Sequence, residues 1–511
     1  MTPEQKGSLP LRVEKLFYEM QDRIFSDIVR RIKKTGEITS TADYQINKLL
    51  ILGNSTEFIE QEIKRLTGKT DPEMWELYDK VSNWEYVRYE DAYQQINGNF
   101  IPLEENEQVQ QWSQAVIAQT NGEIENITQS LGMTVDMGGG KKAFTPLSQY
   151  YQTYLDRACM DIVTGSFDYN TVLRRVVKEM TASGLKTIDY ASGYSCRAPV
   201  AARRAIMTGV SQLSAQINEM VAKDLGTDTY EVTWHAGHRP SHWWGGNVYT
   251  KQELQDICHL GDVDGLCGAN CRHSYLAFIP GYSVRTYTDG QLLELEAREE
   301  ITKNWRGKEY NPYEASQMQR KLETKMRSQR ANVRQLQQGG AEQSEVLAAK
   351  SRYLNTLHQY QAFSKAMEIS EQMERVYMDG LGRVAPAKAT YRKTIAKMEK
   401  NAILKSKLRE AGLRGTIHTT PVKIDMNLLS FDNEHINRQR GHGVSFEEAK
   451  SFITNAVISE TVWKGRFERY YSFDGVAYVN RNNLQIRTAY KPDQYSKVVQ
   501  KVMEVLKKYG E

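Results

Sequence analysis

Residues 234–273 read WHAGHRPSHWWGGNVYTKQELQDICHLGDVDGLCGANCRH and hold five of the chain's nine histidines and three of its five cysteines. Imidazole and thiolate are the ligands that zinc prefers, and a closed structural site needs four of them around the ion. Gly245-Gly246 and Gly261 interrupt the segment, which favours short strands and loops over a long helix. We therefore predict a small zinc-knuckle-like β/loop module here.

The cysteines Cys267 and Cys271 have the short spacing of a knuckle, and His238 and His273 are possible substitutes among the histidines. A catalytic metal is disfavoured because only Glu253 offers a base and no His-Glu-x-x-His helix is present. A polar core without metal, or a disulfide, is the alternative to a structural zinc. The predicted ligands are His235, His242, Cys267 and Cys271.

The composition is that of a globular chain: 511 residues, 40% hydrophobic and 25% charged, which allows two to four domains. No apolar run approaches the length that spans a bilayer, so no membrane contact is expected. The first residues, MTPEQKGSLPLRVEK, lack the apolar core of a signal peptide. Few cysteines, several of them beside histidines, indicate a reducing compartment and metal binding.

Hydrophobic periodicity predicts a mainly α N-terminal and central region. Apolar residues recur at three- and four-residue steps from Val13 to Ile32, before Gly36. The pattern predicts a helix over 57–66 and a new one opening at Asp71-Pro72, where proline is tolerated. Further helices are predicted over 146–180 and 199–225.

A long helical hairpin is predicted from Pro312 to Met378, because apolar residues there are sparse and helically spaced and Gly339-Gly340 interrupts the run. The lysine-rich stretch that follows, up to Arg409, has the composition of a linker.

The last hundred residues predict an α+β domain with an antiparallel sheet. A helix is expected over 446–458, strands over 466–473 and 476–479 around the Asp474-Gly475 turn, another strand over 484–490, and a terminal helix over 494–508. Residues 411–511 carry 15 Lys and Arg against 11 Asp and Glu, which is the whole net charge of +4.

The predicted domains are therefore four. They are a helical N-terminal region at 1–137, a core with the His/Cys cluster at 141–300, the hairpin and linker at 301–410, and the α+β domain at 411–511.

A second concentration of reactive side chains lies in DNEHINRQRGHGVSFEEAK, residues 432–450, and in QIRTAYKP, residues 485–492. RNA cleavage by internal 2′-OH attack needs a base, an acid and cations that hold the phosphate. Histidines take the proton roles near neutral pH, and arginine or lysine stabilises the phosphate. A surface helix with incidental histidines and arginines is the alternative.

Three stretches, HAGHRPSHWWGGNVY (235–249), GLCGANCRHSYLAFIPG (265–281) and WRGKEYNPYEASQMQRKLE (305–323), resemble the phage minor capsid protein 2 family, which is related to Mu-F-type head-morphogenesis proteins. The helix RAPVAARRAIMTGVSQ (197–212) fits the same pattern, and the resemblance covers roughly residues 5–380. It implies that His235, His242, Cys267, Cys271 and His273 match recurring positions, with His238 an extra.

The C-terminal segments are similar to the phage barnase–EndoU–colicin–RelE-like nuclease group. That resemblance implies a metal-independent endoribonuclease in 411–511. It implies an acid/base role for His435, support from Arg440 and His442, and phosphate binding by Thr488 and Tyr490.

Together the resemblances imply a phage head-morphogenesis protein of the virion, attached to portal or capsid proteins and present in the host cytoplasm during assembly, with RNA as the partner of its C-terminal domain. Two alternatives stay open. The C-terminal domain is an inactive binding module, or the chain binds phage DNA during packaging or ejection.

Overall fold

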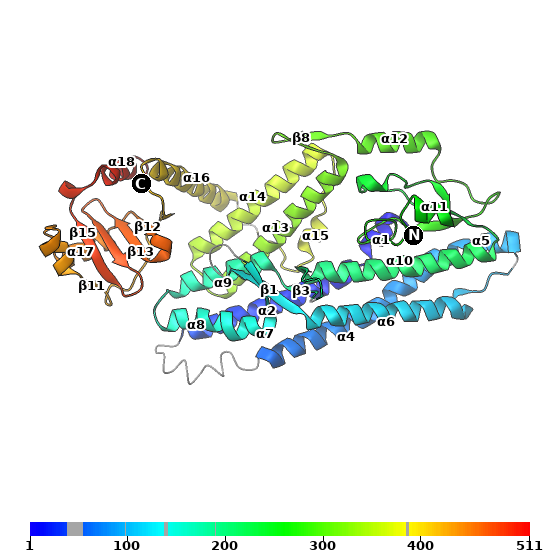
Figure 1. The fold of residues 1–511 in the computed structure, drawn as a ribbon, viewed down its shortest axis with the longest axis horizontal. Coiled ribbons are helices and arrows are strands. Elements are labelled where there is room, and N and C mark those ends of the chain that lie inside the picture. The colour runs from blue at the N-terminus through cyan, green and yellow to red at the C-terminus, as the bar shows by residue number, and fades with distance from the viewer. Residues whose placement is uncertain (38–54, 98, 137–141, 190, 385–387, 511) are drawn as a thin grey trace.

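The computed structural model describes residues 1–37, 55–97, 99–136, 142–189, 191–384 and 388–510. It confirms a mainly helical N-terminal and central region, a small β/loop module, a long helical hairpin and an α+β C-terminal part (Figure 1). The predicted boundary between 1–137 and 141–300 lies outside the described residues, and the four domain limits stay predictions.

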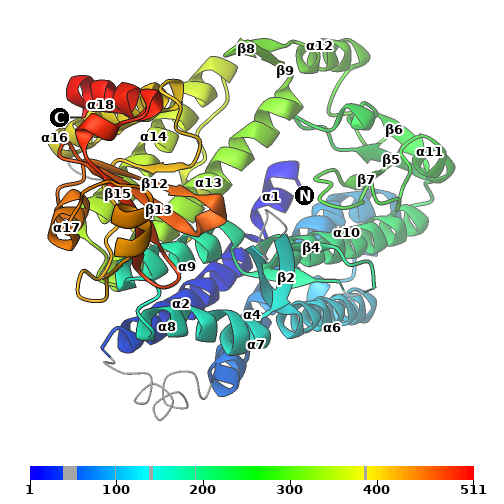
Figure 2. The same cartoon turned by 60° about the vertical axis from the view of Figure 1, so that its left-hand side comes forward.

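Long helices form the N-terminal half and pack along one another (Figures 1 and 2). The apolar stripe that predicts the first long helix is its buried face: Phe17, Met20, Ile24 and Ile28 have no exposed surface. The helices are α1 (Pro3–Ser8), α2 (Leu11–Thr35), α4 (Ser55–Tyr86), α5 (Glu90–Ala92), α6 (Glu107–Gln129), α7 (Leu147–Gln149), α8 (Asp156–Val163), α9 (Tyr169–Ser183) and α10 (Ala198–Asp224).

Asp71-Pro72 does not open a new helix, because α4 runs through it with Pro72 inside. A proline ring normally clashes with the carbonyl four residues earlier. That residue is Gly68. Leu66 and Met74, on either side of Pro72, are both buried in the same core. Packing on both sides therefore keeps the helix continuous despite the lost hydrogen bond.

A four-stranded sheet that the sequence did not predict lies between these helices, with the strand order β2-β1-β3-β4. All its neighbouring strands are antiparallel. Its strands are β1 (Leu131–Asp136), β2 (Lys142–Pro146), β3 (Lys186–Ile188) and β4 (Ser195–Arg197).

The predicted knuckle module follows α10 as a three-stranded sheet of order β6-β5-β7 with loops around it. A helix and a two-stranded ribbon then lead into the hairpin. The elements are β5 (Thr229–Val232), β6 (Val248–Thr250), α11 (Lys251–Asp256), β7 (Tyr275–Phe278), α12 (Asp289–Glu299), β8 (Lys303–Trp305) and β9 (Lys308–Tyr310).

The hairpin consists of α13 (Pro312–Gln338) and α14 (Gln343–Met367), which turn at the predicted glycine pair, and the short α15 (Met373–Tyr377) packs against α13. A capping box in which Asn311 and Glu314 bond reciprocally begins α13. Tyr360 and Phe363 of α14 are fully buried. This apolar seam holds an otherwise polar hairpin to the rest of the protein.

The C-terminal part is a six-stranded sheet of order β10-β12-β13-β14-β15-β11. It is antiparallel except for β11, which pairs with β15 in parallel. One face packs on α16 and α18 and the other on α17, with separate cores. Its elements are α16 (Lys388–Glu410), β10 (Thr416–His418), β11 (Ser430–Phe431), α17 (Phe446–Thr454), β12 (Ile458–Val462), β13 (Phe467–Tyr471), β14 (Val476–Asn480), β15 (Gln485–Tyr490) and α18 (Lys497–Tyr509).

The stretch with a linker composition is helical. Leu404 and Leu408 of α16 are buried in the same core as Val502 and Leu506 of α18. The lysine-rich surface of α16 hides this contact in the sequence, because apolar residues are few among the lysines.

Candidate functional site

Antiparallel pairing of β5 and β7 brings the two ends of the His/Cys segment together. Val232 lies opposite Tyr275, and the Thr233 amide donates to the Ser274 carbonyl at 2.9 Å. Continued by two residues, this register sets His235 beside Arg272. A terminal guanidinium nitrogen of Arg272 lies 3.1 Å from His235 Nδ1, which is also 3.0 Å from the Ala236 carbonyl oxygen. The strand pairing therefore positions histidines that are almost forty residues apart.

The loop before Cys271 folds tightly upon itself. The Cys271 amide donates to the Gly268 carbonyl at 3.0 Å. A Cβ atom on Gly268 would lie 2.2 Å from the Asp262 carbonyl oxygen, and one on Gly265 would lie 2.0 Å from that of His259. Only glycine fits at such distances. The glycines of GLCGANC therefore serve the turn that aims Cys271 inward.

Three donor atoms converge at the centre of the module: His242 Nδ1, His273 Nδ1 and Cys271 Sγ. The two nitrogens are 3.3 Å apart, and the sulfur lies 3.5 Å from His273 Nδ1 and 3.9 Å from His242 Nδ1. All three side chains are buried. No other group of three or more potential ligands of this kind occurs in the described ranges.

Hydrogen bonding leaves the His242 Nδ1 lone pair free to face this centre. His242 Nε2 is 2.7 Å from the Asp264 carbonyl oxygen, which only accepts, so Nε2 carries the proton. Metal-ligating histidines commonly donate their second nitrogen to a carbonyl in this way. Burial lowers the pKa of His242 and holds that of His273 well below its usual range, so both rings stay neutral, as ligands must be.

The group supplies three of the four donors that a closed tetrahedral zinc site requires. Zn–N bonds of 2.0–2.1 Å and Zn–S bonds of about 2.3 Å imply donor separations of about 3.3 Å between nitrogens and about 3.6 Å between nitrogen and sulfur. The separations around His242, Cys271 and His273 lie close to these values. Two imidazoles and one thiol are also the correct donor chemistry.

The structure brings together two of the four predicted ligands, His242 and Cys271, and adds His273, which the sequence offers as a substitute. His235 lies against His273, with the rings tilted and their centroids 4.4 Å apart, but its Nδ1 is 3.0 Å from the Ala236 carbonyl oxygen and 3.1 Å from an Arg272 nitrogen. Cys267 lies outside the three-atom group. Burial raises the pKa of Cys267 to about 11.

The remaining candidates around the cluster have other partners. His238 donates from Nδ1 to the Arg239 carbonyl at 2.9 Å, and its Nε2 is 3.2 Å from a Glu296 carboxylate oxygen. Glu253, the one residue considered as a base, closes the capping box of α11 with Thr250. The five cysteines are free thiols, so no disulfide bridges the module.

The N-terminal helix α1 closes over the cluster, a contact that the sequence did not reveal. The fully buried Lys6 donates from Nζ to the His273 carbonyl at 2.6 Å. This bond joins residues that are 267 positions apart in the chain. The hydrogen bond therefore joins the N-terminal helix α1 to the knuckle module at the His/Cys cluster.

In the C-terminal part, three of the predicted residues gather at one end of the sheet. Thr488 and Tyr490, two apart on β15, share a face, and Thr488 lies opposite Tyr478. The His442 ring centroid is 5.6 Å from that of Tyr490, and His442 Nδ1 is 2.9 Å from Gln494 Oε1. Burial raises the pKa of Tyr490, so its hydroxyl is a hydrogen-bond donor rather than an acid.

His435 and Arg440 lie apart from this group. His435 is in the turn Glu434–Gln439, with Nδ1 3.1 Å from Gln439 Oε1, and Arg440 is exposed at the end of that turn. Among the described residues no hydrogen bond or ring contact joins His435 to His442, Thr488 or Tyr490. The two predicted histidines therefore occupy different surroundings.

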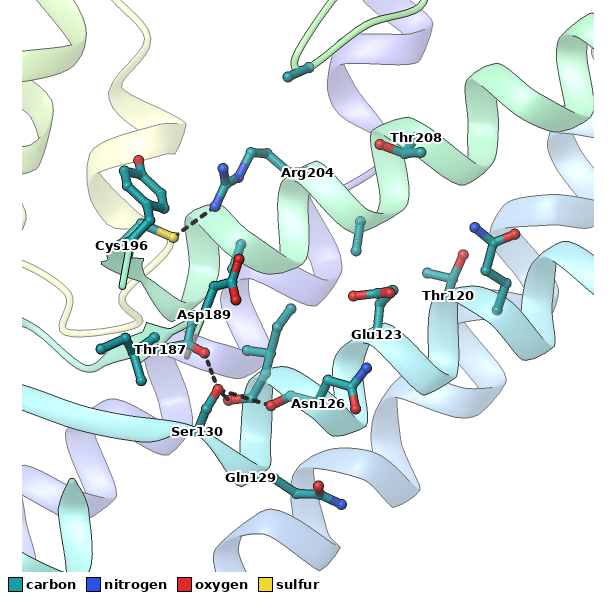
Figure 3. A pocket seen from close by; sticks show the side chains of 17 residues that line it. Thr120, Glu123, Asn126, Gln129, Ser130, Thr187, Asp189, Cys196, Arg204 and Thr208 are labelled. Atoms are coloured by element: carbon teal, nitrogen blue, oxygen red, sulfur yellow. Dashed lines mark hydrogen bonds between the residues drawn. The ribbon is translucent and has the colours of Figure 1, made fainter. Parts of the chain in front are cut away.

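A polar groove of about 780 Å³ lies between α6, the β3–β4 edge and α10 (Figure 3). Arg204 crosses its wall, with a terminal nitrogen 2.9 Å from Cys196 Sγ and the guanidinium over the Tyr194 ring. Ser130 and Thr187 share a 2.5 Å hydrogen bond at the other side. Hydroxyl and amide groups dominate the wall, which suits binding of polar groups and offers no nucleophile–base pair.

Fold and cluster define a mainly helical protein built around a His/Cys knuckle. The family model described as phage minor capsid protein 2 matches residues 1–365, so the chain belongs to that family. It is a bacteriophage minor capsid protein of the virion, where it associates with other virion proteins. No curated protein and no solved structure matches the chain. None of the helices in the described ranges is long and apolar enough to cross a bilayer.

Proposed function

We propose that this minor capsid protein is a structural part of the phage head that attaches to the portal or the capsid during assembly in the host cytoplasm. A zinc ion held by His242, Cys271 and His273 rigidifies the module that makes the attachment. The observation that supports this most strongly is the convergence of three buried donor atoms at 3.3–3.9 Å. The other two ligands predicted from the sequence, His235 and Cys267, lie outside this group of three donors.

When bound, zinc supplies a cross-link between three segments of the module. His242 belongs to the turn Pro240–His242, Cys271 ends the glycine loop and His273 precedes β7. In small modules such ligation supplies folding free energy directly. Lys6 links α1 to this module, because its Nζ donates a hydrogen bond to the His273 carbonyl.

The zinc proposal is tested by measuring bound metal in the purified full chain and in two variants. We expect about one zinc per chain in the parent and less than a tenth of that in Cys271→Ser, since a hydroxyl is a poor zinc ligand. Cys267→Ser is the matched control and should keep the metal. If both variants lose zinc to the same extent, Cys267 is also a zinc ligand. A parent without zinc would contradict the proposal.

The attachment itself is tested by assembly of phage heads carrying each variant. Cys271→Ser should be missing from purified heads while Cys267→Ser is incorporated at the parental level. Normal incorporation of a zinc-free Cys271→Ser protein would show that the metal has no part in attachment.

We propose a second activity, endoribonuclease cleavage by the C-terminal domain, favoured by the cluster of His442, Thr488 and Tyr490. In this proposal His442 takes the proton of the ribose 2′-OH as the oxygen attacks phosphorus. The P–O5′ bond breaks as the 5′-oxygen takes a proton from a solvent water, and a 2′,3′-cyclic phosphate forms. Thr488 and Tyr490 donate hydrogen bonds to the phosphate, while Arg440 and His435 act from the adjacent turn.

Cleavage of transfer RNA by the full chain in the presence of a chelator tests this activity. We expect His442→Ala to lower the rate by roughly 10²–10⁴-fold, the usual contribution of a general base. Arg438→Ala is the control, because Arg438 is 74% exposed and pairs only with Glu434. If His435→Ala loses cleavage activity and His442→Ala does not, His435 is the general base. If the RNA stays intact with the parent and with every variant, the C-terminal domain is a binding module and not a nuclease.

A further inference from the structure

Two polar cavities adjoin along helix α9, and we call the pair the α9 groove. The first, of about 710 Å³, lies between α9 and the four-stranded sheet. The second, of about 530 Å³, lies between α9 and the hairpin of α13 and α14. Figures 1 and 2 show α9 beside the sheet and the hairpin. Arg174, Lys178 and Ala182 follow one another at one-turn steps on α9 and line both cavities, so this ridge joins them into one surface.

Basic side chains outnumber carboxylates in the α9 groove. The charged residues that line the first cavity are the carboxylates Asp136 and Glu179 and the cations Lys142, Arg174, Arg175, Lys178, Lys186 and Arg197. The second cavity adds Arg352 and Glu345. Behind the lining, Arg175 pairs with Asp161 at 2.5 Å. When all four carboxylates are set against the seven cations, three positive charges remain in excess.

Most cations of the α9 groove have no carboxylate partner. Arg174 pairs with Glu345 at 2.7 Å, and Arg175 pairs with Asp161. In the part of the chain that the structure describes, no ion pair involves any of the other five cations. Two of these, Lys142 and Lys178, are exposed. Their ammonium groups are therefore accessible to an anion that enters from solvent.

The sheet places two of the cations without an ion pair next to each other. Lys186 of β3 lies directly opposite Arg197 of β4 in the antiparallel register. Like charges in such a cross-strand pair destabilise a sheet. Burial lowers the pKa of Lys186, and repulsion from Arg197 and Lys142 lowers it further. A terminal nitrogen of Arg197 donates to the Ala182 carbonyl at 3.0 Å, a neutral acceptor. An anion in the groove would relieve this repulsion.

We propose that the α9 groove binds the phosphate backbone of double-stranded DNA. Lysine and arginine side chains distributed over two adjoining cavities suit a row of phosphates better than a single ion. Hydroxyl groups of the lining, such as those of Thr171 and Ser328, are suitable donors to phosphate oxygens. Among the described residues no aromatic side chain lines either cavity, so the bases of a single strand would have no stacking partner. This inference does not depend on zinc or on ribonuclease activity.

The test measures binding of the full chain to a blunt DNA duplex over a range of salt concentrations. Lys142→Gln combined with Lys178→Gln removes two exposed cations without breaking an ion pair, so the thermal midpoint should stay parental. We expect the slope of log affinity against log salt concentration to become shallower by about two, and the affinity near 0.1 M salt to fall by roughly tenfold or more. Lys501→Gln combined with Lys507→Gln, two exposed lysines of α18, is the matched control and should bind as the parent does.

Three outcomes would overturn the proposal: a parent that binds no duplex, a parental slope in the Lys142→Gln, Lys178→Gln variant, or a loss of affinity confined to the α18 variant. A duplex of unrelated sequence should bind equally well, because backbone contacts carry no sequence information. Polyglutamate that displaces the duplex as effectively as unlabelled DNA does would also contradict the proposal, since the groove would then accept an acidic protein.

Discussion

Replacing Arg330 with leucine is expected to release residues 373–384 from the hairpin at a cost of about 3–5 kcal/mol, the usual penalty for breaking one side of a buried ion pair. Arg330 has no exposed surface and forms a bidentate pair with Asp379 at 2.7 and 2.8 Å. It also donates to the Gly382 carbonyl at 2.8 Å. Its guanidinium lies 4.7 Å from the Tyr377 ring centroid. Leucine would leave the Asp379 carboxylate without this partner.

Amide hydrogen exchange over 373–384 measures this effect directly, because it reports local opening. We expect exchange at least 100-fold faster in Arg330→Leu, whereas Arg334→Leu, one turn later on the exposed face, should match the parent. Replacing both partners, Arg330→Met with Asp379→Asn, should recover much of the protection, because no unpaired charge then remains. Unchanged exchange in Arg330→Leu would show that the ion pair does not hold this segment.

Long periodic helices and the C-terminal hairpin strands could be predicted because their cues are local. The apolar stripe of α2 and the glycine pair between α13 and α14 are properties of a few adjacent residues. The Asp474-Gly475 turn likewise places β13 and β14. Strands of two or three residues, such as β3 and β11, are too short to show a period. The sheets they complete arise from pairing between distant segments.

The density of histidine and cysteine marks the candidate metal centre in the sequence, but the choice among them depends on the fold. Strand register sets His235 opposite Arg272, and its Nδ1 lies within 3.1 Å of both an Arg272 nitrogen and the Ala236 carbonyl oxygen. Cys267 adopts a left-handed backbone conformation, with φ of 62°, and lies outside the three-atom group. Neither effect is visible in the spacing of CGANC.

Acidification from pH 7 to pH 5 is expected to destabilise the zinc-free knuckle module, with about 2 kcal/mol of the loss coming from His235 alone and a further loss from His242 and His273. Burial lowers the pKa of His235 to about 3, lowers that of His242, and holds that of His273 well below its usual range. The unfolded chain, with pKa values near 6.5, therefore takes up protons first. The stability that neutral rings provide is complete above that value and is lost as the pH falls toward the folded values.

This loss is measured by amide exchange of β5 and β7 in chelator-treated protein between pH 7 and pH 5, corrected for intrinsic rates. The slope of the opening free energy against pH gives the number of protons taken up on opening. We expect a slope of more than one proton in the parent, a slope lower by about one proton in His235→Gln, and the parental slope in His259→Gln, whose side chain is 63% exposed. Carboxylates titrate mostly below this window, so the slope reports histidine. A His235→Gln slope equal to the parental one would mean that His235 is not buried as a neutral ring. Bound zinc should move the whole loss to lower pH, because protons must then displace the metal from His242, Cys271 and His273.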